Sequence, residues 1–144
     1  MNKIVFVCLG NICRSPMAEF VMKELDQEKS LHIESRATSS WEHGNPVHKG
    51  NQKILRKYAI SFDSSKGSQQ ISQADFEFFD LVVGMDESNV EDLLQISAGR
   101  YDDKIKLFRP GGVPDPWYTG DFEETYKLVT AGCRDWLQWI KDRQ

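Results

Sequence analysis

Apolar residues along this chain fall into short, nearly continuous runs separated by longer stretches with helical spacing. The runs are rich in β-branched side chains, a composition typical of strands that are buried on both faces. The predicted strands cover residues 3–8, 32–38, 80–85 and 105–108. In the other stretches, apolar residues recur every three or four positions, which predicts helices with one buried face. These predicted helices cover residues 16–25, 45–58, 88–96 and 121–140.

Residues that favour helix starts stand at the head of two of these stretches. Ser15 is expected to cap the first helix, with Pro16 as its first residue, and residues 121–124 match a capping box. The expected inner faces are Met17, Phe20, Val21 and Leu25; Val47, Ile54, Leu55 and Tyr58; Val90, Leu93 and Leu94; and Phe122, Tyr126, Val129, Cys133, Trp136, Leu137 and Ile140.

Strands and helices alternate along the whole chain, which contains no internal repeat and no low-complexity segment. Such alternation implies right-handed crossovers and a parallel sheet covered by helices. We therefore predict an α/β fold with three layers, a twisted four-stranded parallel sheet between helices, and one domain over residues 1–144. Ligands of such sheets bind beyond the carboxyl ends of the strands.

The composition excludes several classes of protein. Hydrophobic residues make up 40% of the 144 positions and charged residues 28%, as in ordinary soluble proteins. The net charge of −4 argues against nonspecific nucleic-acid binding. No apolar stretch approaches the roughly 20 residues of a membrane span, and the start of the chain does not resemble a signal peptide. These features, with only three cysteines, predict a cytoplasmic protein with reduced thiols.

Candidate chemistry follows the first predicted strand, in residues 8–16. Cys8 stands at the end of the strand, the loop residues Leu9, Gly10, Asn11, Ile12 and Cys13 follow, and Arg14 comes next. The loop amides and the following helix N-terminus can surround a tetrahedral anion, while the guanidinium binds two of its oxygens. The same positive environment is expected to lower the pKa of the Cys8 thiol and make it a nucleophile.

The other loop residues have expected supporting tasks. Gly10 suits a backbone position with positive φ, and Asn11 suits side-chain hydrogen bonds that brace the loop. The Ser15 hydroxyl can stabilise the sulfur when it acts as a leaving group. The alternative interpretation makes Cys8 a core residue, Arg14 a surface charge and Ser15 a plain helix cap. A cysteine and an arginine six positions apart leave that alternative open, but the complete motif after a buried strand disfavours it.

Asp115 is the candidate proton donor for the departing oxygen. It lies between Pro114 and Pro116, which restrict its backbone, and beside Trp117 and Tyr118, which are expected to desolvate the carboxyl group and raise its pKa. The alternative is an aspartate with a structural role in a turn, which the Asp-Pro sequence also favours.

Four segments together resemble the low-molecular-weight protein tyrosine phosphatases. They are residues 8–16, 35–41 with 44–46, 83–89 and 115–118, in the order and spacing of that family. The resemblance implies that Cys8 forms a phosphocysteine, Arg14 binds the phosphate, and Asp115 acts as general acid and then as general base. It also implies that Asn11, Ser15 and Ser35 support the loop, and that no cofactor or metal takes part.

The resemblance further implies an aromatic rim made of Trp41, Trp117 and Tyr118, which favours the long phosphotyrosine ring over phosphoserine. Many members have tyrosine where Trp41 and Trp117 stand. Some have a histidine near residues 64–65 that supports the loop, and because this chain has none there, another group must brace it. Cys13 is expected to form a protective disulfide with Cys8, the alternative being a plain buried thiol.

The expected partners are tyrosine-phosphorylated proteins, with a bacterial tyrosine kinase among them, and inorganic phosphate as product and inhibitor. A monomer is expected, as is usual in the family, without nucleic-acid or membrane binding.

Three rival functions remain on the sequence alone. An arsenate reductase would need two further reactive cysteines, whereas this chain offers only Cys133. A protein arginine phosphatase usually has threonine at the position of Ile12. A non-enzymatic phosphate-binding module would not need Cys8 and Asp115 together.

Overall fold

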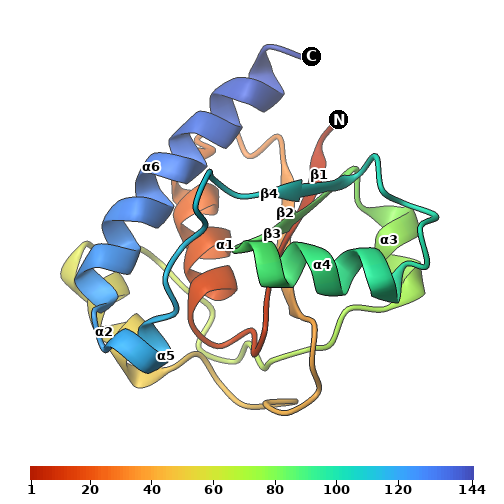
Figure 1. Cartoon of the computed structure of the whole chain (residues 1–144). Helices are drawn as coiled ribbons and strands as arrows, with labels where there is room; N and C mark the ends of the chain where they lie inside the picture. Colours follow the sequence, from red (N-terminus) through yellow and green to blue (C-terminus); the bar gives the residue numbers. More distant parts are fainter.

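The computed structural model describes all residues from 1 to 144, and its centre is a four-stranded parallel sheet (Figure 1). The strands are β1 (Lys3–Cys8), β2 (His32–Ala37), β3 (Leu81–Gly84) and β4 (Ile105–Leu107), in the order β2-β1-β3-β4. The helices are α1 (Arg14–Leu25), α2 (Lys49–Lys57), α3 (Gln73–Phe78), α4 (Glu87–Ile96), α5 (Pro116–Thr119) and α6 (Phe122–Lys141). The predicted α/β class, the four strands and their parallel pairing are confirmed.

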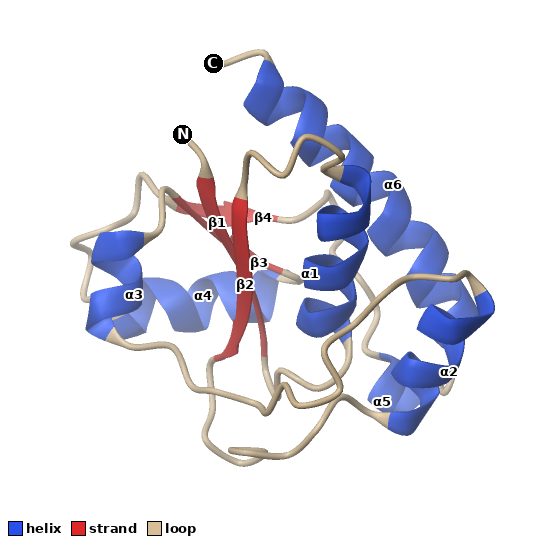
Figure 2. Ribbon diagram, turned by 180° about the vertical axis from the view of Figure 1, so that it is seen from behind, coloured by secondary structure: helices blue, strands red, loops and turns tan.

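Helices cover both faces of the sheet, which confirms the three layers. Figure 2 shows α1 and α6 on one side and α3 and α4 on the other. Alternate residues of β1 face the two sides, as the two-residue period of a strand requires. Ile4 and Phe6 belong to a core with α1 and α6, whereas Val5 and Val7 belong to a second core with α3 and α4.

The central strand β1 is buried along almost its whole length, and its carboxyl end fixes the position of Cys8. Cys8 pairs with Ala37 of β2, and Val7 pairs with Gly84 of β3. The loops that leave these three strands therefore meet at one edge of the sheet. Because β1 has neighbours on both sides, this edge is the natural place for a ligand.

Most predicted inner faces are confirmed, with one exception in α4. Val129 and Cys133 of α6 are fully buried, and Leu93 of α4 is too. The prediction for Leu94 is wrong, since that side chain is 36% exposed. A ten-residue helix at the edge of the sheet buries a narrower stripe than the sequence pattern indicates.

Several predicted boundaries shift. The second helix begins at Lys49 rather than residue 45, because Pro46 forms an isolated bridge with Gly67 and the Asn45 carbonyl accepts from the Ser68 amide. The prediction that Ser15 caps the first helix is wrong: α1 begins at Arg14, with Cys13 at the cap and no side-chain cap. Of the predicted capping box at α6, the bond from the Glu124 amide to Asp121 is present.

Two short helices escape the sequence pattern. α3 has six residues and α5 only four, too few to show a period. α3 nevertheless has a complete capping box between Ser72 and Asp75.

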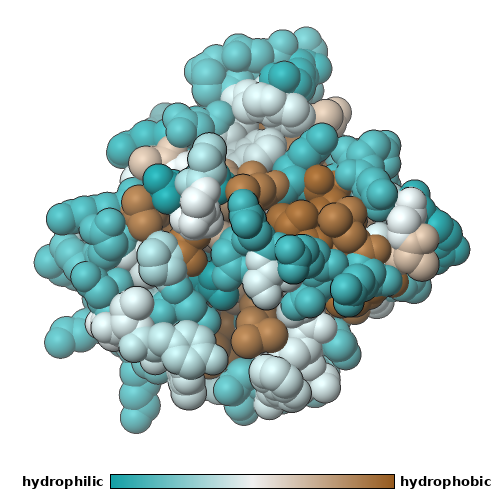
Figure 3. Space-filling view, in the orientation of Figure 1, coloured by the Kyte–Doolittle hydropathy of each residue, from teal (hydrophilic) through white to brown (hydrophobic).

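On the face shown in Figure 3, brown apolar atoms gather in small groups separated by polar side chains. None of the helices is both long enough and apolar enough to cross a membrane.

Candidate active site

The segment between β1 and α1 wraps around the sulfur of Cys8. Cys8 is only 3% exposed, and the amide of Asn11 donates to its Sγ at 3.3 Å. The Ser15 hydroxyl lies 3.0 Å from the same sulfur. Ser15 thus serves the sulfur rather than the helix start, which explains why it does not cap α1. A thiolate can only accept hydrogen bonds, and both neighbours are able to donate.

Five of the carbonyl groups from Cys8 to Cys13 are held by donors outside the loop. The outside donors are Thr38 N to Cys8 O (3.0 Å), Ser39 Oγ to Leu9 O (2.8 Å), Ser68 Oγ to Gly10 O (2.7 Å), His48 N to Ile12 O (2.9 Å) and Asn51 Nδ2 to Cys13 O (2.7 Å). Since the carbonyls are bound to the outside, the loop amides are left to face a ligand. Converging amides of this kind form an anion-binding nest.

Asn11 determines the shape of the loop through its backbone conformation and its side-chain hydrogen bonds. Its φ of 56° lies in the left-handed region, which asparagine tolerates better than most residues. Its Nδ2 donates to Ser15 Oγ at 2.8 Å, and its Oδ1 accepts from the Gln69 amide at 3.2 Å. The prediction that Gly10 takes a positive φ is therefore wrong, because Asn11 makes the turn instead. The predicted bracing role of the Asn11 side chain is confirmed.

Arg14 is almost completely buried and is held by two acidic side chains. Its Nη1 donates to Asp86 Oδ2 at 2.5 Å and to the carbonyl of Val113 at 3.0 Å, and its Nη2 lies 3.4 Å from Asp115 Oδ2. Burial alone would lower the pKa of Arg14, but the negative charges of Cys8, Asp86 and Asp115 raise it overall. The guanidinium is thus a permanent cation beside Asp115, and it is close enough to Cys8 for the charge of that sulfur to raise its pKa.

Asp115 reaches the site from the loop before α5. It is the N-cap of α5, and its Oδ1 accepts from the Trp117 amide at 3.0 Å. Its other oxygen lies beside Arg14. Pro116 occupies the first turn of α5, so the predicted constraint from proline is real, although the sequence pattern does not reveal the helix.

These elements enclose a pocket of about 240 Å³ with Cys8 and Asp115 in its wall. The complete lining is Cys8, Leu9, Gly10, Ile12, Cys13, Trp41, Glu42, Asp115, Trp117 and Tyr118. The predicted rim residues Trp41, Trp117 and Tyr118 are therefore brought together, and all three are exposed. Glu42 also lines the pocket but was not predicted, because no motif distinguishes it from an ordinary surface carboxylate.

Cys13 lines the same pocket as Cys8, and both are free thiols. Burial raises the pKa of Cys13, and the charge on Cys8 raises it further. Cys13 is therefore a protonated thiol next to the candidate nucleophile. Cys133 does not line the pocket. It is fully buried in the core, with its sulfur 3.6 Å from the Ala18 carbonyl oxygen.

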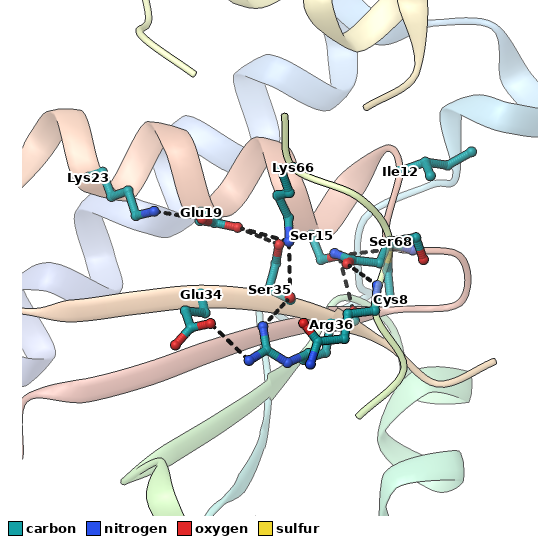
Figure 4. Close-up of polar contacts among 12 residues, drawn as sticks. Cys8, Ile12, Ser15, Glu19, Lys23, Glu34, Ser35, Arg36, Lys66 and Ser68 are labelled. Atoms are coloured by element: carbon teal, nitrogen blue, oxygen red, sulfur yellow. Dashed lines mark hydrogen bonds and ion pairs between the residues drawn. The ribbon is translucent and has the colours of Figure 1, made fainter. Parts of the chain in front are cut away.

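Ser35 supports the loop only at a distance. Figure 4 shows its hydroxyl directed at Glu19, to which it donates at 2.5 Å, rather than at the loop. Lys66 lies 3.6 Å from the same Glu19 oxygen and donates to the Ser35 carbonyl at 3.3 Å. Burial lowers the pKa of Lys66 despite the attraction of Glu19.

The link from this buried cluster to the site is the backbone of β2. The carbonyl of Arg36, next to Ser35, lies 3.3 Å from the Ser15 oxygen and is the alternative acceptor to the Cys8 sulfur for the single Ser15 proton. The groups that brace the loop directly are Ser68 and Gln69, which follow Lys66 in the chain. Sequence reasoning indicated only that some group must take this place.

Comparisons with known proteins agree with this geometry. The family model described as "Low molecular weight phosphotyrosine protein phosphatase" matches residues 3–144. A relative from Bacillus subtilis, the low molecular weight protein-tyrosine-phosphatase YfkJ, is 40% identical, with 100% of this chain and 99% of that protein covered.

Two solved structures are also similar. One is the crystal structure of a low molecular weight protein tyrosine phosphatase from Streptococcus pyogenes. It has 60% identity and a TM-score of 0.95, and the match covers 97% of this chain and 93% of that one. The other is an arginine phosphatase from Drosophila, with 30% identity, a TM-score of 0.86 and coverage of 96% and 98%.

Proposed function

The chain belongs to the low molecular weight phosphotyrosine protein phosphatase family, and we propose that Cys8, Arg14 and Asp115 carry its reaction, the hydrolysis of phosphotyrosine in proteins. One observation supports these assignments above all others. A buried sulfur and a carboxylate line one pocket with an aromatic rim, and a buried guanidinium from a third element lies beside that carboxylate.

In the first step the Cys8 thiolate attacks phosphorus, and the bond from phosphorus to the tyrosyl oxygen breaks. Asp115 in its acid form gives its proton to that oxygen, so the product leaves as a neutral phenol. Arg14 and the loop amides bind the three equatorial oxygens, on which charge is spread in the transition state. The Ser15 hydroxyl and the Asn11 amide stabilise the sulfur.

In the second step the Asp115 carboxylate takes a proton from water, and the water oxygen attacks the phosphocysteine. The phosphorus–sulfur bond breaks, inorganic phosphate leaves, and the thiolate returns. Because inorganic phosphate has the shape and charge for which the loop is built, we expect it to inhibit competitively.

The pocket wall favours an aryl phosphate. Ile12, Trp41, Trp117 and Tyr118 present apolar and aromatic surface above the sulfur, on which a tyrosyl ring can stack. The likeness to the Drosophila arginine phosphatase makes phosphoarginine the second candidate substrate. Branched, aliphatic Ile12 offers no hydroxyl to orient a guanidinium, and for this reason phosphotyrosine is preferred here.

The remaining expectations belong to the same proposal. Tyrosine-phosphorylated proteins are the substrate class, with a bacterial tyrosine kinase among the candidates, and the chain is expected to act as a monomeric single domain. Free Cys8 and Cys13 suit a reducing compartment, which favours the cytoplasm.

Cys13 is proposed to protect the nucleophile. Peroxide would convert the Cys8 thiolate to a sulfenic acid, and the Cys13 sulfur would then displace hydroxide to form a disulfide. Dithiothreitol should restore activity after mild peroxide treatment of the native protein. Cys13→Ala should lose most of this recovery, and full recovery in that variant would contradict the role.

The direct test compares hydrolysis of three peptides that carry phosphotyrosine, phosphoserine or phosphoarginine, each in the presence of a chelator. We expect turnover of the phosphotyrosine peptide only. Cys8→Ser should abolish this turnover and retain phosphate binding, whereas Cys133→Ser should retain both. Preferred hydrolysis of phosphoarginine, or turnover that survives Cys8→Ser, would contradict the proposal.

A further inference from the structure

A second groove lies directly beside the catalytic pocket, on the side of α4. It is lined by Leu9, Thr38, Ser39, Trp41, Asp92, Gln95 and Ile96. Leu9 and Trp41 line the catalytic pocket too, so the two hollows share a wall. Figure 1 shows how this comes about, since the loop after β2 passes beside α4 near the first loop of the chain. A peptide whose phosphotyrosine occupies the pocket can therefore place a neighbouring side chain in this groove.

Trp41 differs from the other three tryptophans of the chain. Trp117 contacts the ring of His48, Trp136 contacts Trp139, and the guanidinium of Arg143 lies 3.6 Å above Trp139. Trp41 is 77% exposed and has neither an aromatic nor a cationic neighbour within the chain. An exposed indole face without a partner is a favourable site for a cation.

The polar lining of the groove is acidic and lacks a counter-charge. Asp92 is half-buried and forms no ion pair or hydrogen bond within the chain, and no lysine or arginine lines the groove. The Thr38 hydroxyl, also in the lining, is buried and has no hydrogen-bond partner. Ile96 and Leu9 supply apolar surface that suits the methylene stem of a long side chain.

The shared wall suits one particular peptide geometry. Trp41 lines both hollows, and two groups packed on opposite faces of its indole would lie about 7 Å apart, twice a van der Waals separation of about 3.5 Å. In an extended peptide, side chains two residues apart lie on the same face and are also about 7 Å apart. A residue two positions from the phosphotyrosine can therefore reach the groove while the tyrosyl ring fills the pocket.

We propose that this groove is a substrate subsite for an arginine or lysine side chain located two residues from the phosphotyrosine. Its stem lies on Leu9 and Ile96, its charge faces the indole of Trp41, and its head pairs with Asp92. The proposal rests on the phosphotyrosine phosphatase activity proposed above. It implies that acidic peptides, including those with a second phosphate at this position, are poor substrates.

The test measures kcat/KM for a set of phosphotyrosine peptides. Arginine, norleucine or glutamate is placed two residues before or two residues after the phosphotyrosine, and control peptides carry arginine at the adjacent positions. The native chain should prefer arginine to norleucine about fivefold at one of the two distant positions, as an exposed cation–π contact plus an exposed ion pair allows. This preference should fall as ionic strength rises.

Variants then test whether Asp92 is the residue whose charge recognises the arginine of the peptide. Asp92→Asn should reduce the preference to about twofold or less, and Asp92→Lys should invert it in favour of glutamate. Glu91→Gln is the matched control, because Glu91 is exposed on α4 but does not line the groove, and it should keep the native preference. The ratio between two peptides within one variant cancels any general change in activity.

Three outcomes would overturn the subsite. They are equal rates for the arginine and norleucine peptides, a preference unchanged in Asp92→Lys, and a preference lost in Glu42→Gln but kept in Asp92→Asn. The last would show that Glu42, which lines the catalytic pocket, recognises the arginine of the peptide in place of Asp92. Failure to hydrolyse any of the peptides would instead overturn the proposed activity itself.

Discussion

The floor of the site, namely Cys8 in the pocket wall with Ser15 at its sulfur and Arg14 beside Asp115, is at most 3% exposed at each residue, whereas Trp41 and Tyr118 at the rim are 77% and 78% exposed. Each floor residue makes hydrogen bonds or ion pairs with residues distant in the chain, while the Trp41 indole has no such partner. A group held by several partners keeps its position during the reaction, and an exposed ring can adapt to different peptides. The contrast indicates that the chemistry is fixed by burial and that substrate choice depends on a few surface contacts.

The largest effect is expected from the floor cation. Arg14→Lys keeps a positive charge but loses the planar fork that binds two phosphate oxygens and Asp86 together. We expect kcat for phosphotyrosine to fall about 10³-fold. Arg134→Lys, exposed on α6 and absent from the pocket lining, is the control and should retain native kcat. A loss of less than tenfold in Arg14→Lys would mean that the floor tolerates imprecise geometry.

Asp115 lies between floor and rim and should give the next largest effect. Asp115→Asn removes the proton donor, and kcat for phosphotyrosine should fall about 10²-fold. The loss should be much smaller for an activated aryl phosphate, whose leaving group needs little protonation. Asp102→Asn, in an exposed turn, is the control. Equal losses for both substrates would contradict the acid role.

Asn51 tests whether support from outside the floor matters. This fully buried residue of α2 donates to the carbonyls of Cys13 and Ile12, at 2.7 and 3.4 Å. Asn51→Ala removes the side-chain bond at the Cys13 carbonyl and leaves it to the Met17 amide alone, so the loop is held less firmly. We expect kcat to fall about tenfold and stability by about 1–3 kcal/mol. Lys53→Ala on the exposed side of α2 should change neither. Thermal melts and kinetics together check this, and lost stability with native kcat would show that Asn51 has only a structural role.

The smallest effect is expected at the rim. Trp41→Ala removes a stacking surface from the tyrosyl ring but touches no reacting atom. KM for a phosphotyrosine peptide should rise about three- to tenfold, with kcat within about twofold of native. Tyr118→Ala provides the comparison at a second exposed residue of the rim. A fall in kcat as large as that of Asn51→Ala would remove the distinction between floor and rim.

The sequence predicts those parts of the molecule whose structure is determined by residues close together in the chain. The strands around Val5 and Val82 and the long helix containing Val129 follow from local periodicity, and all occur close to the predicted bounds. The motif at residues 8–16 predicts the loop because its chemistry is contained in one segment.

What the sequence does not predict comes from long-range contacts or from short elements. Nothing near Ser68 or Asn51 in the sequence indicates that these side chains hold the loop carbonyls, because the contacts span 58 and 38 residues. The positive φ was expected at Gly10, since glycine adopts it most readily, but the hydrogen bonds of Asn11 place it one residue later. Short α5 shows no period, although it orients Asp115.

The outward-held carbonyls have a consequence for how the protein is made. Cys8 leaves the ribosome before the donors that shape its loop, which come from segments 30 residues or more further on, and Arg14 contacts Asp115 across 101 residues. A nascent chain thus carries an exposed cysteine without its anion site until the segment with Asp115 has also been synthesised. Appearance of phosphatase activity should therefore report completion of folding, later than formation of the first helix.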